Sequence, residues 1–252
     1  MEGEEFTCKE VPGLLSAFVD AFVDFSVSDG IFLPPANEGI ADSPTRLPEA
    51  ERLVAIGDVH GDFEKTKQSL RMSGIIDSSN RWSGGSATVV QIGDVLDRGG
   101  EEIKILYFLE RLKREAIANG GNLITMNGNH EIMNVEGDFR YATESGLKEF
   151  ENWAFWYRIG LKLKNPSRGD DIFDGIPTSF PGVKPEFHKG IRARIAALRP
   201  KGPVTERFLA KNTTVAVVGE SVFVHGGLLK EHAEYGLERM NSEVREWMSG
   251  GR

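Results

Sequence analysis

The sequence predicts an α/β fold in which the first strands of the sheet run parallel. Between residues 51 and 134, short apolar runs of strand character alternate with segments whose apolar residues recur at helical spacing. This alternation is typical of βαβ units, whose crossovers are right-handed. The chain has 252 residues, 40% of them hydrophobic and 27% charged, which is enough for one large domain or two small ones with a well-buried core.

Residues 1–50 are expected to form a lead-in to the main domain, which would span 51–252. Apolar residues three and four apart predict an amphipathic helix over 11–25. We expect this helix to pack on its own domain, with docking onto a partner as the alternative. Residues 29–48 are rich in Pro, Asp and Gly and indicate a loop.

The alternating part is expected to contain strands at 52–57, 87–92 and 122–127, with helices at about 62–73 and 100–117 between them. Residues 135–205 lose the alternation and are expected to form an insertion that walls a substrate cleft. Within it we predict helices at 145–161 and 190–198, and a surface loop at 165–186. After the insertion, residues 213–218 and 221–224 are typical of a β-hairpin, and 235–248 of a helix.

Composition narrows the class of function. The net charge of −8 argues against a general nucleic-acid or anionic-membrane surface. The single cysteine, Cys8, permits no disulfide within the chain, and no apolar run approaches the roughly 20 residues that span a bilayer. The acidic N-terminus resembles neither a signal peptide nor a transit peptide, so the expected location is cytoplasmic.

Four short motifs rich in Asp, Asn and His each follow one of these strands directly. They are Gly-Asp-Val-His-Gly at 57–61, Gly-Asp-Val-Leu-Asp-Arg-Gly at 93–99, Gly-Asn-His-Glu at 128–131 and His-Gly-Gly at 225–227. Because sites in such sheets lie beyond the carboxyl ends of the strands, we expect the motifs to meet at one edge. Carboxylate and amide oxygens together with imidazole form a ligand set for divalent metal ions.

The spacing of these residues predicts a site for two ions. Asp58 and His60 are two positions apart on extended backbone and can reach the same ion, while Asp94 can bridge two ions through its two oxygens. Asn129 offers an amide oxygen and His225 an imidazole. Two ions about 3.5–4 Å apart can hold both the attacking and the leaving oxygen of an in-line displacement.

Residues beside the ligands suggest acid–base and phosphate chemistry. His130 is a natural general acid, and Asp97 can orient its imidazole. Arg98 supplies a planar fork that binds phosphate oxygens. Glu131 either supports the site or serves as a local cap.

The complete motif series resembles that of the phosphoprotein phosphatases within the calcineurin-like metallophosphoesterases. The flanking stretches at 89–102, 125–134 and 222–229 resemble the plant type of the Shewanella-like protein phosphatases. This resemblance implies an αββα sandwich and hydrolysis of phosphomonoesters on a phosphoprotein or phosphopeptide by a metal-bridging hydroxide. It leaves phosphotyrosine versus phosphoserine or phosphothreonine open, because Asn127 stands where the Ser/Thr enzymes carry an arginine.

The resemblance also assigns roles to residues. It implies two divalent ions, with Mn²⁺ usual in vitro and Fe or Zn possible. The implied metal ligands are Asp58, His60, Asp94, Asn129 and His225; the implied catalytic pair is His130 with Asp97; and Arg98 and Asn129 are the implied phosphate-binding residues.

The chain departs from the family after His225. The family fold continues through further strands that supply one more histidine to the second ion, and His232 is not expected to replace it. We therefore expect a sandwich that lacks its last strands, a second metal site short of one ligand and impaired activity. Two alternatives stay open, a dinucleoside polyphosphate hydrolase on the same scaffold and an inactive phosphatase-like binding protein. No nucleic-acid or membrane partner is expected, and the oligomeric state is left open.

Overall fold

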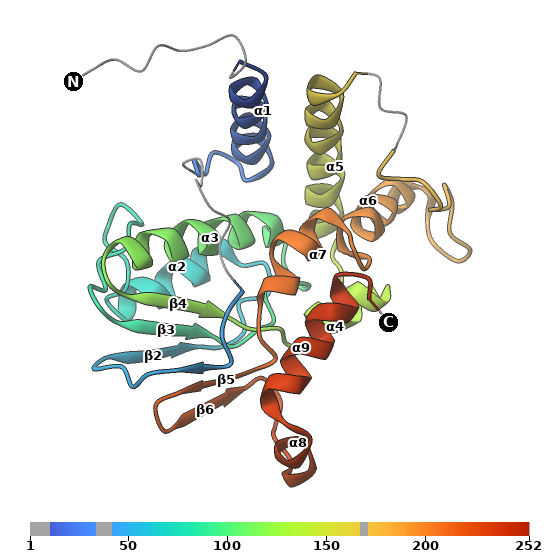
Figure 1. Ribbon diagram of the computed structural model, residues 1–252. Coiled ribbons are helices and arrows are strands. Elements are labelled where there is room, and N and C mark those ends of the chain that lie inside the picture. Colours follow the sequence, from blue (N-terminus) through green and yellow to red (C-terminus); the bar gives the residue numbers. More distant parts are fainter. Residues whose placement is uncertain (1–10, 34–41, 167–170, 252) are drawn as a thin grey trace, which may run out of the picture.

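A computed structural model describes residues 11–33, 42–166 and 171–251 of the chain, and its α/β architecture confirms the predicted class (Figure 1). The strands are β1 (Arg46–Leu47), β2 (Leu53–Ile56), β3 (Thr88–Gln91), β4 (Asn122–Thr125), β5 (Val215–Val218) and β6 (Ser221–Val224). The helices are α1 (Val11–Val27), α2 (Phe63–Met72), α3 (Glu102–Ala118), α4 (Asn129–Glu136), α5 (Glu144–Lys164), α6 (His188–Leu198), α7 (Pro203–Arg207), α8 (Lys230–Tyr235) and α9 (Leu237–Met248), with single 3₁₀ turns η1 (Pro185–Phe187) and η2 (Leu209–Lys211).

Two three-stranded sheets lie against each other. One is fully parallel in the order β2-β3-β4, and the other has the order β1-β5-β6, with β1 parallel and β6 antiparallel to β5. A parallel bridge between Met126 and Thr213 joins them. The predicted hairpin is confirmed, since Val218 pairs with Ser221 across the Gly219–Glu220 turn.

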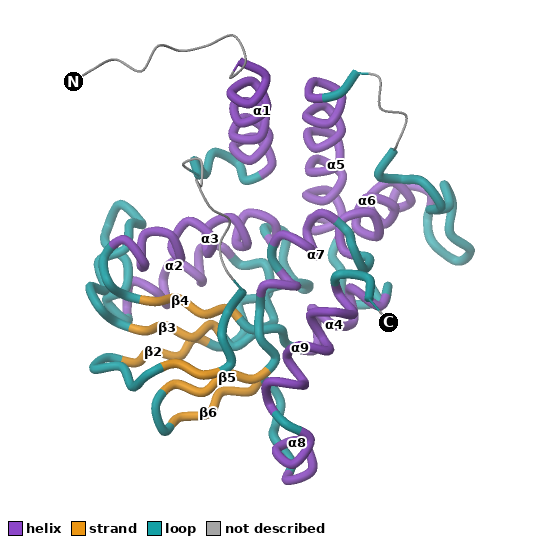
Figure 2. Tube along the Cα trace, in the orientation of Figure 1, coloured by secondary structure: helices purple, strands orange, loops and turns teal. Residues whose placement is uncertain are grey.

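The alternation of side chains along the strands produces the layers. Val89 and Leu123 belong to the large core under α2 and α3, whereas Val90 and Ile124 belong to a smaller cluster that includes Ala216 of β5. This two-residue period is expected for strands that are buried on both faces. On the outer face of β5, Val215 and Val217 pack with Leu237 at the start of α9. Figure 2 shows α2 and α3 along one side of the β2-β3-β4 strands and the β5-β6 pair on the other side, with α9 near the ends of β5 and β6.

The lead-in packs on its own domain, as expected. Val19 and Val23 of α1 are buried against α5, where Gly160 lets the two helices approach closely. Asp24 of α1 also forms an ion pair with Arg207 of α7, at 2.6 Å. The loop prediction for 29–48 was wrong at its end, because β1 pairs there with β5; a two-residue strand has no periodicity to detect.

Two further corrections concern the second half of the chain. The helix predicted at 235–248 is present as α9 but begins two residues later, because Gly236, with a φ of 106°, separates it from α8, a short helix that was not predicted. Helix α7 and turn η2 were not predicted, since each is too short for a helical pattern. Cys8 lies outside the described residues. Among the described residues, no helix has the length and apolar character needed to cross a membrane.

Candidate metal centre

The four motifs meet at the carboxyl edge of the sheets, as predicted, and their backbone there is unusual. Four residues without the freedom of glycine have positive φ, namely His60 (42°), Asp94 (56°), Asp97 (69°) and Arg98 (61°). Such conformations are uncommon outside glycine and cluster where surrounding structure enforces them. Gly99 permits this crowding, because a Cβ there would lie 2.2 Å from the carbonyl oxygen of His60.

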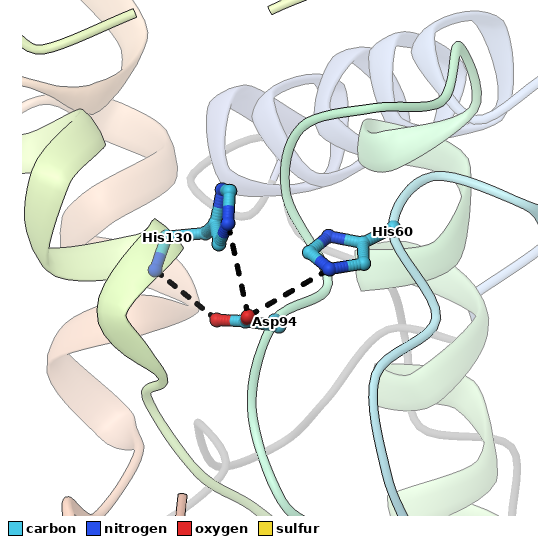
Figure 3. A group of neighbouring side chains, drawn as sticks. All are labelled: His60, Asp94 and His130. Carbon is cyan, nitrogen blue, oxygen red and sulfur yellow. Dashed lines mark hydrogen bonds and ion pairs between the residues drawn. The ribbon is translucent and has the colours of Figure 1, made fainter. Parts of the chain in front are cut away.

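One group of side chains at this edge is buried. The ligand atoms of His60, Asp94 and His130 lie within 4.8 Å of one another (Figure 3). Oδ2 of Asp94 is 3.7 Å from Nε2 of His60 and 3.9 Å from Nε2 of His130. The backbone N–H of His130 donates to Oδ1 of Asp94 at 3.1 Å, which fixes the carboxylate between the two imidazoles.

A second group shares Asp94 but is more open. It contains Asp58, Asp94 and His225, with ligand atoms again within 4.8 Å of one another. Nε2 of His225 is 3.2 Å from Oδ2 of Asp94 and 3.1 Å from Oδ1 of Asn129. The structure therefore brings all five predicted metal ligands together, with Asp94 in the bridging position.

The hydrogen bonds of the two histidines show that these residues fit metal ions. Nδ1 of His60 lies 2.9 Å from the carbonyl oxygen of Leu96, and Nδ1 of His225 lies 2.8 Å from that of Ile92. Each Nδ1 donates to its carbonyl, which in the neutral ring leaves Nε2 as the nitrogen that can bind an ion. Nε2 lies 3.7 Å from Oδ2 of Asp94 in His60 and 3.2 Å in His225. Nε2 of His60 is buried without a hydrogen-bond partner. Nε2 of His225 and Oδ1 of Asn129 are then two acceptors facing each other, an arrangement that a cation between them would stabilise.

Glu131 proves to be a scaffold for the ligand loops. Its carboxylate accepts four backbone N–H groups, those of Gly128, Asp94, Val95 and Leu96, at 2.8 to 3.1 Å. Burial raises the pKa of this carboxyl group, and the four donors oppose that rise. Both sequence interpretations therefore hold, since Glu131 caps the start of α4 through Gly128 and supports the site by tying the 93–99 loop to that helix.

His130 and Asp97 form a buried pair. Nδ1 of His130 donates to Oδ2 of Asp97 at 2.7 Å, and both side chains are buried. Nε2 of His130 lies 3.3 Å from Nη2 of the exposed Arg98. The ring of Tyr141 flanks both residues, 5.0 Å from the His130 ring and 5.5 Å from the Arg98 guanidinium. The free nitrogen of the imidazole is thus directed toward the phosphate-binding candidate.

Hollows border the centre on two sides. A cavity of about 470 Å³ is lined by Asp58, His60, Lys65, Arg98 and other residues of the first two motifs. A second hollow of about 340 Å³ lies beside Asn129 and His225 and is mostly apolar. His232 lines this second hollow, but its Nδ1 accepts a hydrogen bond from the backbone of Leu229 at 3.2 Å.

Sequence reasoning missed three buried polar residues that surround Asp97. They are Glu102 of α3, Asn134 of α4 and Arg194 of α6. Asn134 donates to Oδ2 of Asp97 at 2.8 Å, and Arg194 donates to Oδ1 at 2.8 Å. A lone arginine on an amphipathic helix is typical of a solvated face, so the sequence carried no signal for Arg194.

Comparison with known proteins agrees with this geometry. The family model described as calcineurin-like phosphoesterase matches residues 51–250. Shewanella-like protein phosphatase 2 of Arabidopsis thaliana is 62% identical over 249 residues, which cover 96% of this chain and 63% of that protein. Shewanella-like protein phosphatase 1 of Plasmodium berghei is 40% identical over 194 residues, or 77% of this chain and 44% of that protein. The expected resemblance is confirmed, and the chain spans less than two thirds of these relatives.

A solved structure has the same fold. The cold-active protein-tyrosine phosphatase of a psychrophilic Shewanella species superposes with a TM-score of 0.56 at 22% identity, covering 87% of this chain and 56% of that one. The likeness at this level of identity concerns the arrangement of helices and strands. It agrees with the two-sheet sandwich described above.

Proposed function

Because the chain belongs to the calcineurin-like phosphoesterase family, we propose that it is a metal-dependent protein phosphatase that hydrolyses phosphomonoesters. One observation carries the proposal. The His60–Asp94–His130 and Asp58–Asp94–His225 groups share the carboxylate of Asp94. Asp97 holds the imidazole of His130, and the exposed Arg98 lies next to that ring. Binuclear binding, proton donation and phosphate binding are thereby available at one edge of the fold.

Asp58, His60 and Asp94 would hold one divalent ion, and Asp94, Asn129 and His225 the other. Bound ions would supply Lewis acidity toward the phosphate and a nucleophilic water at neutral pH. The donor set of carboxylate, amide and imidazole suits Mn, Fe or Zn, and we propose Mn²⁺ as the ion to test first.

The residues beside the metal ligands would bind the phosphate group and protonate the leaving oxygen. The Arg98 guanidinium would bind phosphate oxygens as a fork, with the amide of Asn129 beside it. As a water oxygen forms its bond to phosphorus, the P–O bond to the ester oxygen breaks and its electron pair passes to that oxygen. The ester oxygen then takes a proton from Nε2 of His130, which acts in its doubly protonated form. Asp97 keeps Nδ1 of that ring protonated and the ring in place, since its Oδ2 accepts from Nδ1 at 2.7 Å.

The names of the two relatives support a phosphoprotein or phosphopeptide as substrate, and the proposal retains the cytoplasmic location expected from the sequence. Whether the ester is phosphotyrosine or phosphoserine is a question for assay. Asn127 does not decide it, because its buried side chain is hydrogen-bonded to Leu209 and Asn212 and is not among the residues that line the cavity beside Arg98.

The test is a comparison of substrates with the 252-residue chain and Mn²⁺. We expect release of phosphate from a phosphotyrosine or phosphoserine peptide, and none after chelation with EDTA. Preferential cleavage of a diadenosine polyphosphate would instead favour a nucleotide hydrolase. Tight binding of a phosphopeptide without turnover, in protein that contains two ions per chain, would favour the binding-protein alternative.

A further inference from the structure

Arg194 is a fully buried cation that no step of the proposed reaction uses. It belongs to α6, within the insertion, and its side chain is 0% exposed. Its Nη1 and Nη2 donate to Oε1 and Oε2 of Glu102 at 2.9 and 2.7 Å, in the bidentate fashion that arginine favours. The guanidinium also packs over the ring of Phe150, 4.6 Å from its centroid.

The same guanidinium reaches the residues behind His130. Nη2 donates to Oδ1 of Asp97 at 2.8 Å, and Nε donates to Oδ1 of Asn134 at 2.7 Å. Asn134 in turn donates to Oδ2 of Asp97 at 2.8 Å. Arg194 thus holds one oxygen of Asp97 directly and supports the donor to the other.

These bonds leave Asp97 no freedom to rotate. Oδ1 is occupied by Arg194, Oδ2 by Asn134 and His130, and the backbone N–H of Asp97 donates to Glu102 at 2.9 Å. Since the carboxylate is 0% exposed, water offers no replacement partner. Loss of the guanidinium would leave two buried carboxylates, those of Asp97 and Glu102, without their shared cation, which is strongly unfavourable.

From this geometry we infer that Arg194 is a positioning residue, which acts through Asp97 to hold the His130 ring for proton donation to the leaving oxygen. The inference rests on the proposed phosphatase function. It gives the insertion a role in catalysis, because α6 would complete the acid–base machinery from behind. General acid catalysis contributes typically about 10²- to 10⁴-fold, so a misplaced ring has a measurable cost.

The kinetic test uses two aryl phosphates that differ in the quality of the leaving group. In R194M, we expect kcat for phenyl phosphate, the poorer leaving group, to fall about 100-fold, and kcat for p-nitrophenyl phosphate to fall less than about 10-fold. A merely structural defect would lower both equally. R194K keeps the charge without the planar fork and should show a smaller loss of the same kind.

A double-mutant cycle decides whether the effect passes through His130. R194M should cost little in an H130Q background, where no imidazole remains to be positioned. R192M is the matched control, because Arg192 lies on the same helix but donates to the carbonyl oxygens of Ile176 and Phe173 rather than to Asp97. Additive losses in the R194M/H130Q protein, or an equal loss on both esters, would overturn the inference.

A second measurement is independent of activity. In metal-free protein, the Nδ1 proton of His130 should give a downfield NMR resonance because of its 2.7 Å hydrogen bond, identified by its absence in H130Q. We expect R194M and R194K to shift or remove this signal and R192M to retain it. An unchanged signal in folded R194M and R194K would refute the positioning role. Absence of any turnover in wild-type protein would count against the proposed function while leaving this result valid.

Discussion

The two halves of the metal centre share Asp94 but differ in how they are held. On the His60 side, the side chains of His60, Asp94 and His130 are at most 16% exposed, and hydrogen bonds fix Asp94 and His130 in place. On the His225 side, Asn129 is exposed, and β6, the strand that precedes His225, is paired on one side only among the described residues. Asp58, which is 51% exposed, faces both halves. The comparison teaches that one sheet edge can carry two kinds of site side by side. The buried half holds its side chains rigidly, as acid–base catalysis requires, and the more open half suits an ion that binds more weakly.

The largest effect should come from the residue that both halves share. D94N removes a negative charge from both groups and one bridging oxygen, so we expect loss of both ions and a fall in kcat larger than the roughly 10²- to 10⁴-fold expected for loss of a general acid alone. Metal analysis by mass spectrometry and phosphate release would show this. Retention of two ions in D94N would break the idea of a shared centre, and circular dichroism provides the control for folding.

The second test concerns His130, in the buried half of the metal centre. H130Q should lower kcat by about 10²- to 10⁴-fold on an ester with a poor leaving group while the metal content stays unchanged. The reason is that Nε2 of His130 lies 3.3 Å from the guanidinium of Arg98, whereas Nε2 of His60 is buried without a hydrogen-bond partner. A loss of one ion in H130Q would instead identify His130 as a metal ligand.

The third test sharpens the contrast between the halves directly. In a chelator titration of Mn²⁺-loaded protein, we expect the ion bound by His225 and Asn129 to leave first, because Asn129 is exposed and His225 follows a strand that is paired on one side only in the described part of the chain. H225Q should remove that weaker step and leave the stronger one, whereas H60Q should weaken the stronger step. Simultaneous release of both ions from wild-type protein would contradict the difference in holding.

The same contrast explains what the sequence could predict. Asp58, His60 and Asp94 follow strands with a clear apolar pattern, so their meeting at one edge followed from the parallel order of the strands. A glycine-rich motif also marked the His225 strand end, although only the family resemblance, and not the local pattern, implied a second sheet. Local pattern was sufficient in both places because each ligand sits directly after a strand.

The buried ion pair of Arg194 and Glu102 could not be predicted from local sequence patterns. They pair across 92 residues of sequence, and the carboxylates of Glu102 and Asp97 draw the guanidinium into the core only once α3, α4 and α6 are packed together. The glycine at position 146 is explained by the same packing, since a Cβ there would lie 2.4 Å from Oε1 of Glu102. Buried charge clusters depend on tertiary contacts, for which helical periodicity carries no information.

The smallest expected effect concerns Glu149 of α5, which lies behind the buried half. Its carboxylate accepts the backbone N–H groups of Ile103 and Lys104, both at 3.0 Å, at the start of α3. Burial, and then the negative charge of Glu102, raise the pKa of Glu149 from 4.5 to about 8. The folded protein therefore keeps a proton that the unfolded chain releases.

This difference in proton binding fixes the direction of a pH effect. Between pH 4.5 and about 8, the folded state binds the extra proton, so its stability falls as the pH rises through this window. The side chain in E149Q is neutral at every pH, so the free energy of unfolding of this variant should not fall for this reason. Relative to wild type, its free energy of unfolding should therefore rise with pH, by at most about 1.4 kcal/mol per pH unit. Denaturant unfolding at a series of pH values measures the difference. The matched control is E151Q, because Glu151 lies two residues further along α5 and forms a surface ion pair with Lys148. Parallel curves of stability against pH for E149Q and wild type would show that Glu149 is ionised in the folded protein.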